Sequence, residues 1–343
     1  MKNQNISPKT AKHYRFSIII ISAIVLVIVV VASTLMGTVG FTLSELWGVI
    51  TGAYAKEDFV YRIVINIRLA RTITGVCVGM NLAVAGVLLQ GILRNPMASP
   101  NIIGVNAGAG FAAVLIMTVI PGKITAIPIA AFVGAVAAAM IIYLLSLAAG
   151  RDKTIYIVLA GIAVSNLIKA LTSALMDINN DVLDVTYSWL LGSLSGRSWS
   201  AVNTVWPYSL IGLTVAFFIS PKVNLFVLGD EVALSVGLPI RRYRIGIMMV
   251  AAVLAGSAVS VAGTIGFVGL IAPHTARLIV GNDHRYLVPL SAILGAILLI
   301  VSDTVARTVF QPVELSVGII TAILGAPFFL MLLYKKGREW KMR

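Results

Sequence analysis

Long apolar segments recur along the whole chain, and they constrain its fold more than any other feature. Each is about 20 residues long, the length at which an α-helix crosses the roughly 30 Å hydrocarbon core of a bilayer. These segments lie at 16–36, 62–92, 98–120, 126–148, 155–177, 204–226, 243–262, 264–281, 288–308 and 314–334. The chain is 59% hydrophobic and only 11% charged, which excludes an ordinary soluble domain. The sequence therefore predicts an all-α polytopic membrane protein with about ten transmembrane helices.

The distribution of charge predicts that both termini are cytoplasmic. An even number of spans places both ends of the chain on one side, and lysine and arginine favour the cytoplasmic side. In this orientation most of the 26 basic residues are cytoplasmic and most of the 13 acidic residues are outside. Residues 1–15 and 335–343 are then cytoplasmic tails, and 16–334 form one transmembrane domain. The net charge of +13 favours contact with anionic membrane lipid, whereas scattered basic residues do not favour nucleic-acid binding.

The 30 glycines and 12 prolines lie largely within or beside the predicted spans. Lipid tolerates a broken helix only where the freed backbone groups face protein or a wet cavity, so this pattern indicates a translocation pathway. The stretch R-N-P-M-A-S-P-N-I-I-G-V-N-A-G-A-G at 94–110 is the densest case. We expect a rigid inner turn there, followed by a closely packed helix start. The alternative to this structural role is direct contact with the substrate, with Asn101 and Asn106 lining a polar pathway.

The sequence contains no motif for catalysis or ATP hydrolysis. A phosphate-binding G-x-x-x-x-G-K-[ST] loop, an H-E-x-x-H zinc motif and a G-x-S-x-G elbow are all absent. One cysteine and three histidines do not indicate a metal site. We therefore expect no catalytic residue, no metal site and no directly bound cofactor.

Ionisable residues are rare within the predicted spans, although an ion-coupled carrier normally needs them there. Lys169 is the deepest candidate, but its long side chain can also reach the outer interface. The energy for any transport is therefore expected to come from a partner subunit.

The segment at 221–244 is the longest interruption between central spans. Asp230 and Glu231 favour a helix start, and Gly237 with Pro239 ends the helix after about two turns. Such a helix is too short to span a bilayer. On the cytoplasmic face it suits contact with an ATPase subunit, and the alternative is a plain connector with positively charged flanks.

A series of motifs resembles the permease subunits of type II ABC importers for iron siderophores, haem and cobalamin, the FecCD type. The motifs are N-I-R-L-A-R-T at 66–72, G-V-L-L-Q-G at 86–91, R-N-P-M-A-S-P-N-I-I-G-V-N-A-G-A at 94–109, L-G-D-E-V-A-L-S-V-G-L at 228–238, G-F-V-G-L-I-A-P-H at 266–274, D-H-R at 283–285 and E-L-S-V-G-I-I-T-A-I-L-G-A-P at 314–327. The resemblance implies the type II ABC importer permease fold. It also implies a second permease subunit, two ATPase subunits and an extracytoplasmic substrate-binding protein as partners.

The resemblance assigns roles to residues at matching positions. Coupling to the ATPase falls on Leu228, Gly229, Glu231, Ala233, Gly237 and Leu238. An inner gate aligns with Thr154 and Ile155, although Ile155 departs from the family pattern. Docking of carboxylates on the binding protein falls on Arg68, Arg71 and Arg307. The alternative for these arginines is interfacial snorkelling with local pairing, for instance of Arg307 with Asp303 one turn away.

The sequence and the resemblance together predict the transmembrane permease subunit of an ABC importer, with ATP hydrolysed by a partner and not by this chain. The expected location is the bacterial cytoplasmic membrane, and the expected cargo is a ferric siderophore. Haem and cobalamin are the alternative cargoes, and an ion-coupled secondary carrier or a membrane anchor are the alternative classes. Because siderophore systems often pair two different permeases, a heterodimer is favoured over a homodimer.

Overall fold

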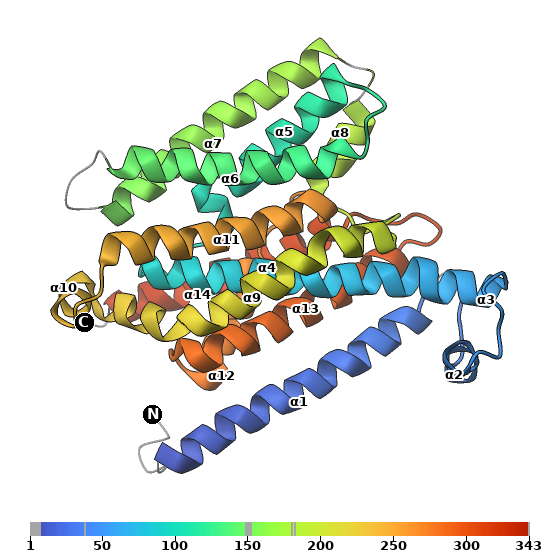
Figure 1. Cartoon of the computed structure of the whole chain (residues 1–343), viewed down its shortest axis with the longest axis horizontal. Helices are drawn as coiled ribbons and strands as arrows, with labels where there is room; N and C mark the ends of the chain where they lie inside the picture. The colour runs from blue at the N-terminus through green and yellow to red at the C-terminus, as the bar shows by residue number, and fades with distance from the viewer. Residues whose placement is uncertain (1–7, 38, 148–152, 180, 182, 342–343) are drawn as a thin grey trace.

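Every element of secondary structure in the described part of the chain is helical (Figure 1). The structure is a computed structural model, and it describes residues 8–37, 39–147, 153–179, 181 and 183–341. In chain order the elements are α1 Pro8–Leu35, α2 Leu43–Thr51, α3 Phe59–Tyr61, η1 Arg62–Leu69, α4 Ala70–Ile92, η2 Pro100–Ile103, α5 Val105–Val119, α6 Ala126–Leu147, α7 Lys153–Ile178, α8 Leu183–Leu191, α9 Trp199–Leu228, α10 Asp230–Ser235, α11 Ile240–Ala262, α12 Val268–Val280, α13 His284–Thr308 and α14 Val317–Lys341. The predicted all-α polytopic fold is confirmed.

Within these described ranges, 8 helices are long and apolar enough to cross a membrane. The longest, Phe59–Ile92, runs through α3, η1 and α4 without a break. Two further apolar helices, α5 and α12, coincide with predicted spans but have only 15 and 13 residues. They are shorter than expected because Gly104 and Phe267, both at positive φ, interrupt the chain just before them. The full count of about ten crossings stays a prediction.

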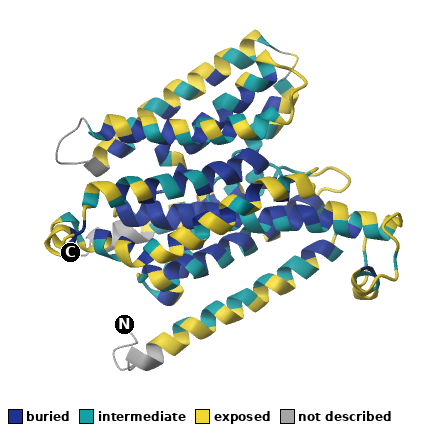
Figure 2. Ribbon diagram, in the orientation of Figure 1, coloured by how far each residue is buried: buried dark blue, intermediate teal, exposed yellow. Residues whose placement is uncertain are grey.

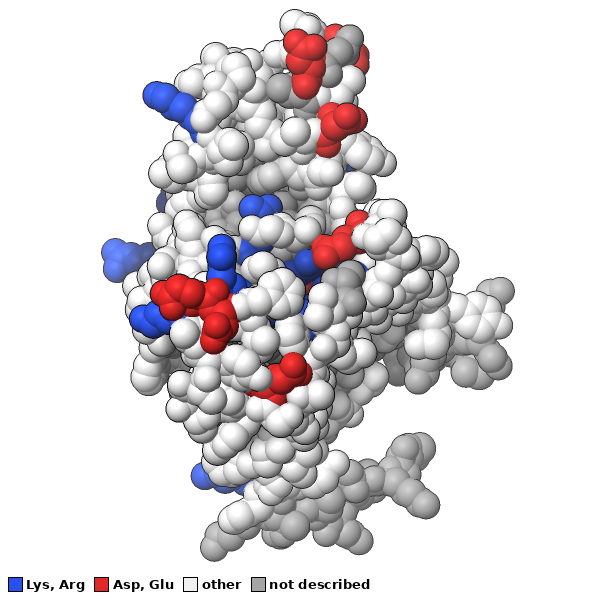
Figure 3. All heavy atoms as spheres, turned by 90° about the vertical axis from the view of Figure 1, so that its right-hand side faces the viewer, with Lys and Arg blue, Asp and Glu red and all other residues white. Residues whose placement is uncertain are grey.

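The two ends of the molecule differ in charge. Helix α10 lies at the same end as the start of α1 and the end of α14, whereas α2 and α3 lie at the opposite end (Figure 1). We call these the inner end and the outer end. Exposed acidic side chains gather at the outer end, on the segments around α3 and α8 (Figure 3); they are Glu57, Asp58, Asp177, Asp181 and Asp184. The predicted topology rests mainly on lysine and arginine, so the membrane side that each end faces stays a prediction.

Helix α4 forms the centre of the core, between α9, α11, α12 and α13 (Figure 2). Glycines allow its backbone to touch its neighbours. A Cβ atom at Gly79 would collide with the backbone of Gly295 in α13, and one at Gly86 would collide with that of Gly269 in α12. Backbone contact of this kind is how helices gain packing energy in lipid, where no hydrophobic effect drives them together.

Helices α5, α6 and α7 form a second group beside the core, in which α6 packs against α11 and the short helix η2 contacts both groups. Residues 93–99 turn back after α4, and Pro100 then starts η2, which ends at Gly104 with φ +73. The carbonyl of Ile102 occupies the space where a Cβ atom at Gly161 of α7 would lie. The predicted rigid turn is therefore present, but the helix start beyond it is broken and not continuous.

Three local features differ from the sequence expectations. Helix α9 continues through Pro221 to Leu228, so the connector comprises 229–239 and not 221–244. Helices α2 and α8 were not expected. In α2, the Thr42 hydroxyl accepts a hydrogen bond from the Glu45 N–H, and the Glu45 carboxylate accepts one from the Thr42 N–H. This capping box is readable in the sequence, but the apolar-length criterion overlooks a helix of 9 residues.

Candidate functional site

The inner end carries the short helix α10, which matches the element predicted from the sequence. Gly229 precedes it at φ +117, and Gly237 follows it at φ +77. Residues with a Cβ atom rarely adopt these values, so glycine allows the chain to enter and leave the helix within a few residues. The Leu238 N–H donates to the Ala233 carbonyl and closes the last turn. The predicted helix and its end at Gly237 are confirmed.

Asp230 ties α10 to the rest of the molecule. Its two carboxylate oxygens accept hydrogen bonds of 2.9 and 2.7 Å from Arg244 Nη2, and Arg94 Nη2 lies 3.8 Å away. Arg244 belongs to α11, and Arg94 belongs to the turn after α4. One carboxylate therefore joins α10, α11 and the end of α4. Sequence reasoning missed this junction because no helical periodicity relates its three members.

The residues assigned to coupling divide into two groups in the structure. Ala233 and Leu238 are buried, so they shape the contact between α10 and the core. Leu228, Glu231 and Gly237 are exposed, and Gly229 is half-buried. Helix α10 also exposes Val232 and Leu234, which the sequence analysis did not select. A short helix with an apolar outer face and a fixed base is suited to contact another protein.

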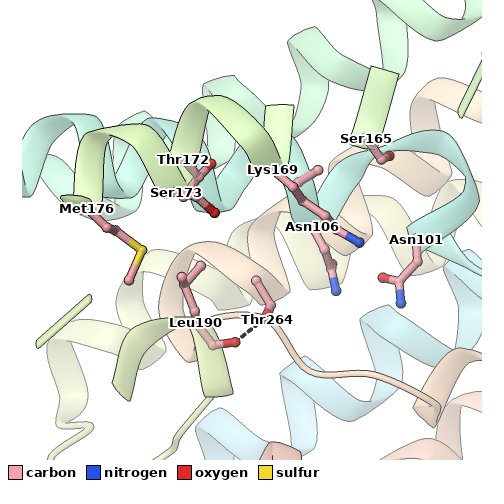
Figure 4. Close-up of a pocket in the computed structure, with 11 residues that line it drawn as sticks. Asn101, Asn106, Ser165, Lys169, Thr172, Ser173, Met176, Leu190 and Thr264 are labelled. Carbon is pink, nitrogen blue, oxygen red and sulfur yellow. Dashed lines mark hydrogen bonds between the residues drawn. The ribbon is translucent and has the colours of Figure 1, made fainter. Parts of the chain in front are cut away.

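A polar cavity of about 480 Å³ lies beside η2 (Figure 4). Asn101 of η2 and Asn106 of α5, the asparagines selected from the sequence, both line it. The other labelled lining residues are Ser165, Lys169, Thr172, Ser173, Met176, Leu190 and Thr264. A second hollow of about 730 Å³ shares both asparagines and extends along α14 to Pro327. The backbone break between η2 and α5 therefore faces a polar space and not lipid, where free backbone groups would lack hydrogen-bond partners.

The structure describes the side chain of one of the two residues predicted to form the inner gate. The side chain of Thr154 lies outside the described residues. Ile155 is in the first turn of α7, and its side chain is 60% exposed. A residue so placed faces away from this chain's own core. Its role as a gate stays a prediction.

The three arginines assigned to docking are buried, with at most 7% of each residue exposed. Arg71 forms hydrogen bonds of 2.8 to 3.2 Å with the Asp303 carboxylate and one of 2.8 Å with Glu314. Arg307 donates to the Met36 carbonyl at 2.9 Å. Arg68 donates to the Leu35 carbonyl at 2.9 Å. These bonds tie the outer ends of α1, α4 and α13 to the segment before α14.

In this structure the three guanidinium groups are therefore held by partners within the chain and are not exposed at the outer surface. Local pairing, the alternative reading of these arginines, is what the structure shows, including Arg307 Nε at 3.8 Å from Asp303. At Glu314, which precedes α14, burial raises the pKa, but the hydrogen bond and charge of Arg71, a hydrogen bond from Ser195 and the charge of Arg307 together hold the pKa below its usual value. The docking role itself stays a prediction.

The D-H-R motif at 283–285 stabilises the inner end. The Asp283 side chain caps α13 by accepting the Arg285 N–H, and it also accepts a hydrogen bond of 2.9 Å from Asn224 of α9. Burial raises the pKa of Asp283, but hydrogen bonds from Arg285 and Asn224 outweigh burial and lower it to about 2. The motif therefore joins α9 to α13 and needs no further function to explain it.

Comparison with known proteins connects this architecture to transport. The model of the FecCD transport family matches residues 25–335. The chain is 42% identical to the Fe(3+)-citrate import system permease protein YfmD of Bacillus subtilis, over 84% of each chain. It is 41% identical to the cobalamin import system permease protein BtuC of Halobacterium salinarum, over 84% of this chain and 79% of that protein.

A solved structure shares the fold. It is an inward-facing conformation of a metal-chelate type ABC transporter, with a TM-score of 0.84 and 29% sequence identity, over 93% of this chain and 99% of that chain. The relatives are transport permeases and not enzymes, and the chain is a multi-pass protein of the bacterial cytoplasmic membrane. The chain therefore belongs to the FecCD transport family of ABC importer permeases.

Proposed function

We propose that this permease moves a ferric siderophore or a related ferric chelate into the cell. The observation that carries the proposal is a polar cavity beside broken helices, combined with a fixed short helix at the inner end. The relative from Bacillus subtilis is a ferric-citrate permease, which favours an iron chelate as cargo. The cobalamin permease shows that a different cargo is compatible with the family, so cobalamin and haem remain the alternatives.

The proposed importer contains four further components. The cavity is open at the surface of the single chain, since Asn101 and Lys169 are exposed, and a second permease subunit would close it. We favour a different permease chain over a second copy. Two ATPase subunits would bind α10 and hydrolyse ATP, so this chain itself needs no cofactor. An extracytoplasmic binding protein would deliver the chelate at the outer end.

A reconstitution experiment tests the proposed function. The permease pair, the ATPase and the binding protein are placed in proteoliposomes, and uptake of a chelate labelled with radioactive iron is measured. We expect uptake to require ATP and the binding protein and to persist when proton and sodium gradients are abolished. Uptake by the permease alone, driven by an ion gradient, would instead identify a secondary carrier. Competition by haem or cobalamin at equal concentration would reassign the cargo.

The coupling role of α10 leads to a prediction about Gly237. Its φ of +77 strongly disfavours a β-branched side chain, so Gly237→Val should distort the end of α10. We expect the ratio of chelate transported to ATP hydrolysed to fall at least about tenfold while the chain remains folded, because the variant alters an exposed turn and not the core. Gly237→Asn is the matched control, since asparagine accepts positive φ more readily. Equal coupling ratios in both variants and the wild type would contradict the role.

Two further roles rest on the family pattern. We propose that Thr154 and Ile155 form the inner gate, and cysteines placed at 154 in both permease subunits should cross-link in a nucleotide-dependent way.

Docking of the binding protein by Arg68, Arg71 and Arg307 would require these side chains to leave their partners within the chain. Charge reversal at Arg68 should then slow association with the binding protein and reduce its salt dependence.

A further inference from the structure

Lys169 lines the cavity, and the proposed function assigns no role to it. Lys169 lies in α7, nine residues before the helix ends at Ile178, or about 14 Å at the 1.5 Å rise per residue of an α-helix. A charged side chain this far inside a span is costly and tends to be retained for function. The position alone leaves open whether the ammonium group reaches the lipid headgroups or faces the interior.

The structure directs Lys169 into the cavity. Its side chain and the amides of Asn101 and Asn106 extend toward the same space, from three separate elements (Figure 4). Hydroxyl groups of Ser165, Thr172 and Ser173 complete the polar wall on α7. Among the described residues, no carboxylate forms an ion pair with Lys169. The ammonium group is therefore a positive charge without an internal counter-ion, placed in a polar space.

Two buried polar atoms at the same wall also lack partners. Asn106 Oδ1 and Ser165 Oγ make no hydrogen bond within the described chain. Buried polar atoms are nearly always paired, so unpaired ones at a cavity wall indicate that something else satisfies them. The cavity volume of about 480 Å³ falls within the range of small-molecule sites.

From this arrangement we infer that Lys169, Asn101 and Asn106 recognise the carboxylate groups of an anionic ferric chelate and make this permease selective for anionic over neutral chelates. The inference rests on the proposed function and narrows its substrate class. The ammonium group offers three donors that rotate freely, so it can follow a carboxylate as the chelate moves. The amide N–H groups of Asn101 and Asn106 donate to the remaining carboxylate oxygens.

Equilibrium binding tests the inference separately from transport. The purified permease–ATPase complex, without the binding protein, is placed in lipid nanodiscs and titrated with radiolabelled ferric citrate or with a neutral ferric trihydroxamate. In Lys169→Gln we expect ferric citrate to bind about tenfold or more weakly, because a charge-assisted hydrogen bond is lost. Trihydroxamate binding should change less than twofold. Lys169→Arg should retain most of the affinity for ferric citrate.

Lys222→Gln is the matched control, since Lys222 is an exposed lysine of α9 that does not line the cavity. Size-exclusion chromatography and the ATPase activity of each complex report whether the variants fold and assemble. Unchanged ferric citrate affinity in Lys169→Gln overturns the inference, as does an equal loss for both chelates. A wild-type complex that binds no ferric citrate overturns it too. A different result would contradict the proposed function itself: no ferric chelate would then be taken up in an ATP-driven way in the proteoliposome assay.

Discussion

Replacing Arg71 with methionine is expected to lower the free energy of unfolding by about 3–5 kcal/mol, the cost of removing one partner from a buried ion pair. The side chains of Arg71 and Asp303 are 8% and 5% exposed, and three of the Arg71 hydrogen bonds end on Asp303. Without Arg71, the one ion-pair partner left to Asp303 among the described residues is Arg307, at 3.8 Å. A buried carboxylate with so little compensation destabilises the folded chain. Loss of helical signal during denaturation in detergent measures the effect.

Arg62→Met provides the matched control, because Arg62 lies in the same continuous helix but is exposed. A double variant, Arg71→Met with Asp303→Leu, should recover much of the stability, since it removes the buried charge together with its partner. If Arg71→Met were as stable as Arg62→Met, the arginine would not stabilise the outer end. Its bonds within the chain could then be broken at little cost, which is what a docking role requires.

The second large effect is expected for Gly161→Val. The carbonyl of Ile102 occupies the space that the new Cβ atom needs, so η2 and α7 must move apart to admit the valine. Overpacking of this kind costs about 1–3 kcal/mol, and here the displaced segment carries Asn101 at the cavity wall. We therefore expect both reduced thermal stability and the loss of most chelate uptake, measured on the same proteoliposome preparation.

Gly246→Val is the control for this variant. Gly246 is also within a predicted span, but a Cβ atom there meets no neighbouring atom within 4 Å. It should retain stability and uptake. Normal uptake by Gly161→Val would show that the position of η2 against α7 is unimportant for the pathway.

The sequence predicted the features that depend on local composition. Apolar runs located all the long helices of the core, and the pattern Asp230, Glu231, Gly237 predicted α10 together with its end. Asn101 and Asn106 were selected because polar residues are unusual beside apolar spans, and both line the cavity. These signals are short-range, so a single sequence contains them.

The remaining features depend on distant parts of the chain. Arg71 and Asp303 are separated by 232 positions, and no pattern in a sequence window relates them. Lys169 was recognised as the deepest ionisable residue, but its neighbours in the cavity, Asn101 and Asn106, belong to other elements and could not be predicted. The glycines and prolines indicated broken helices, but the positions of the breaks at Gly104 and Phe267 were not predicted, since hydropathy reports the length of an apolar run and not its backbone angles.

The junction at Asp230 has a mechanical consequence. A force applied to α10 would reach the membrane domain along the chain, through the buried side chains of Ala233 and Leu238, and at this carboxylate, which contacts Arg244 of α11 and Arg94 of the turn after α4. That turn continues into η2, which forms part of the cavity wall. A displacement of α10 would therefore act at the same time on α11 and, through Arg94 and the turn, on the wall of the cavity.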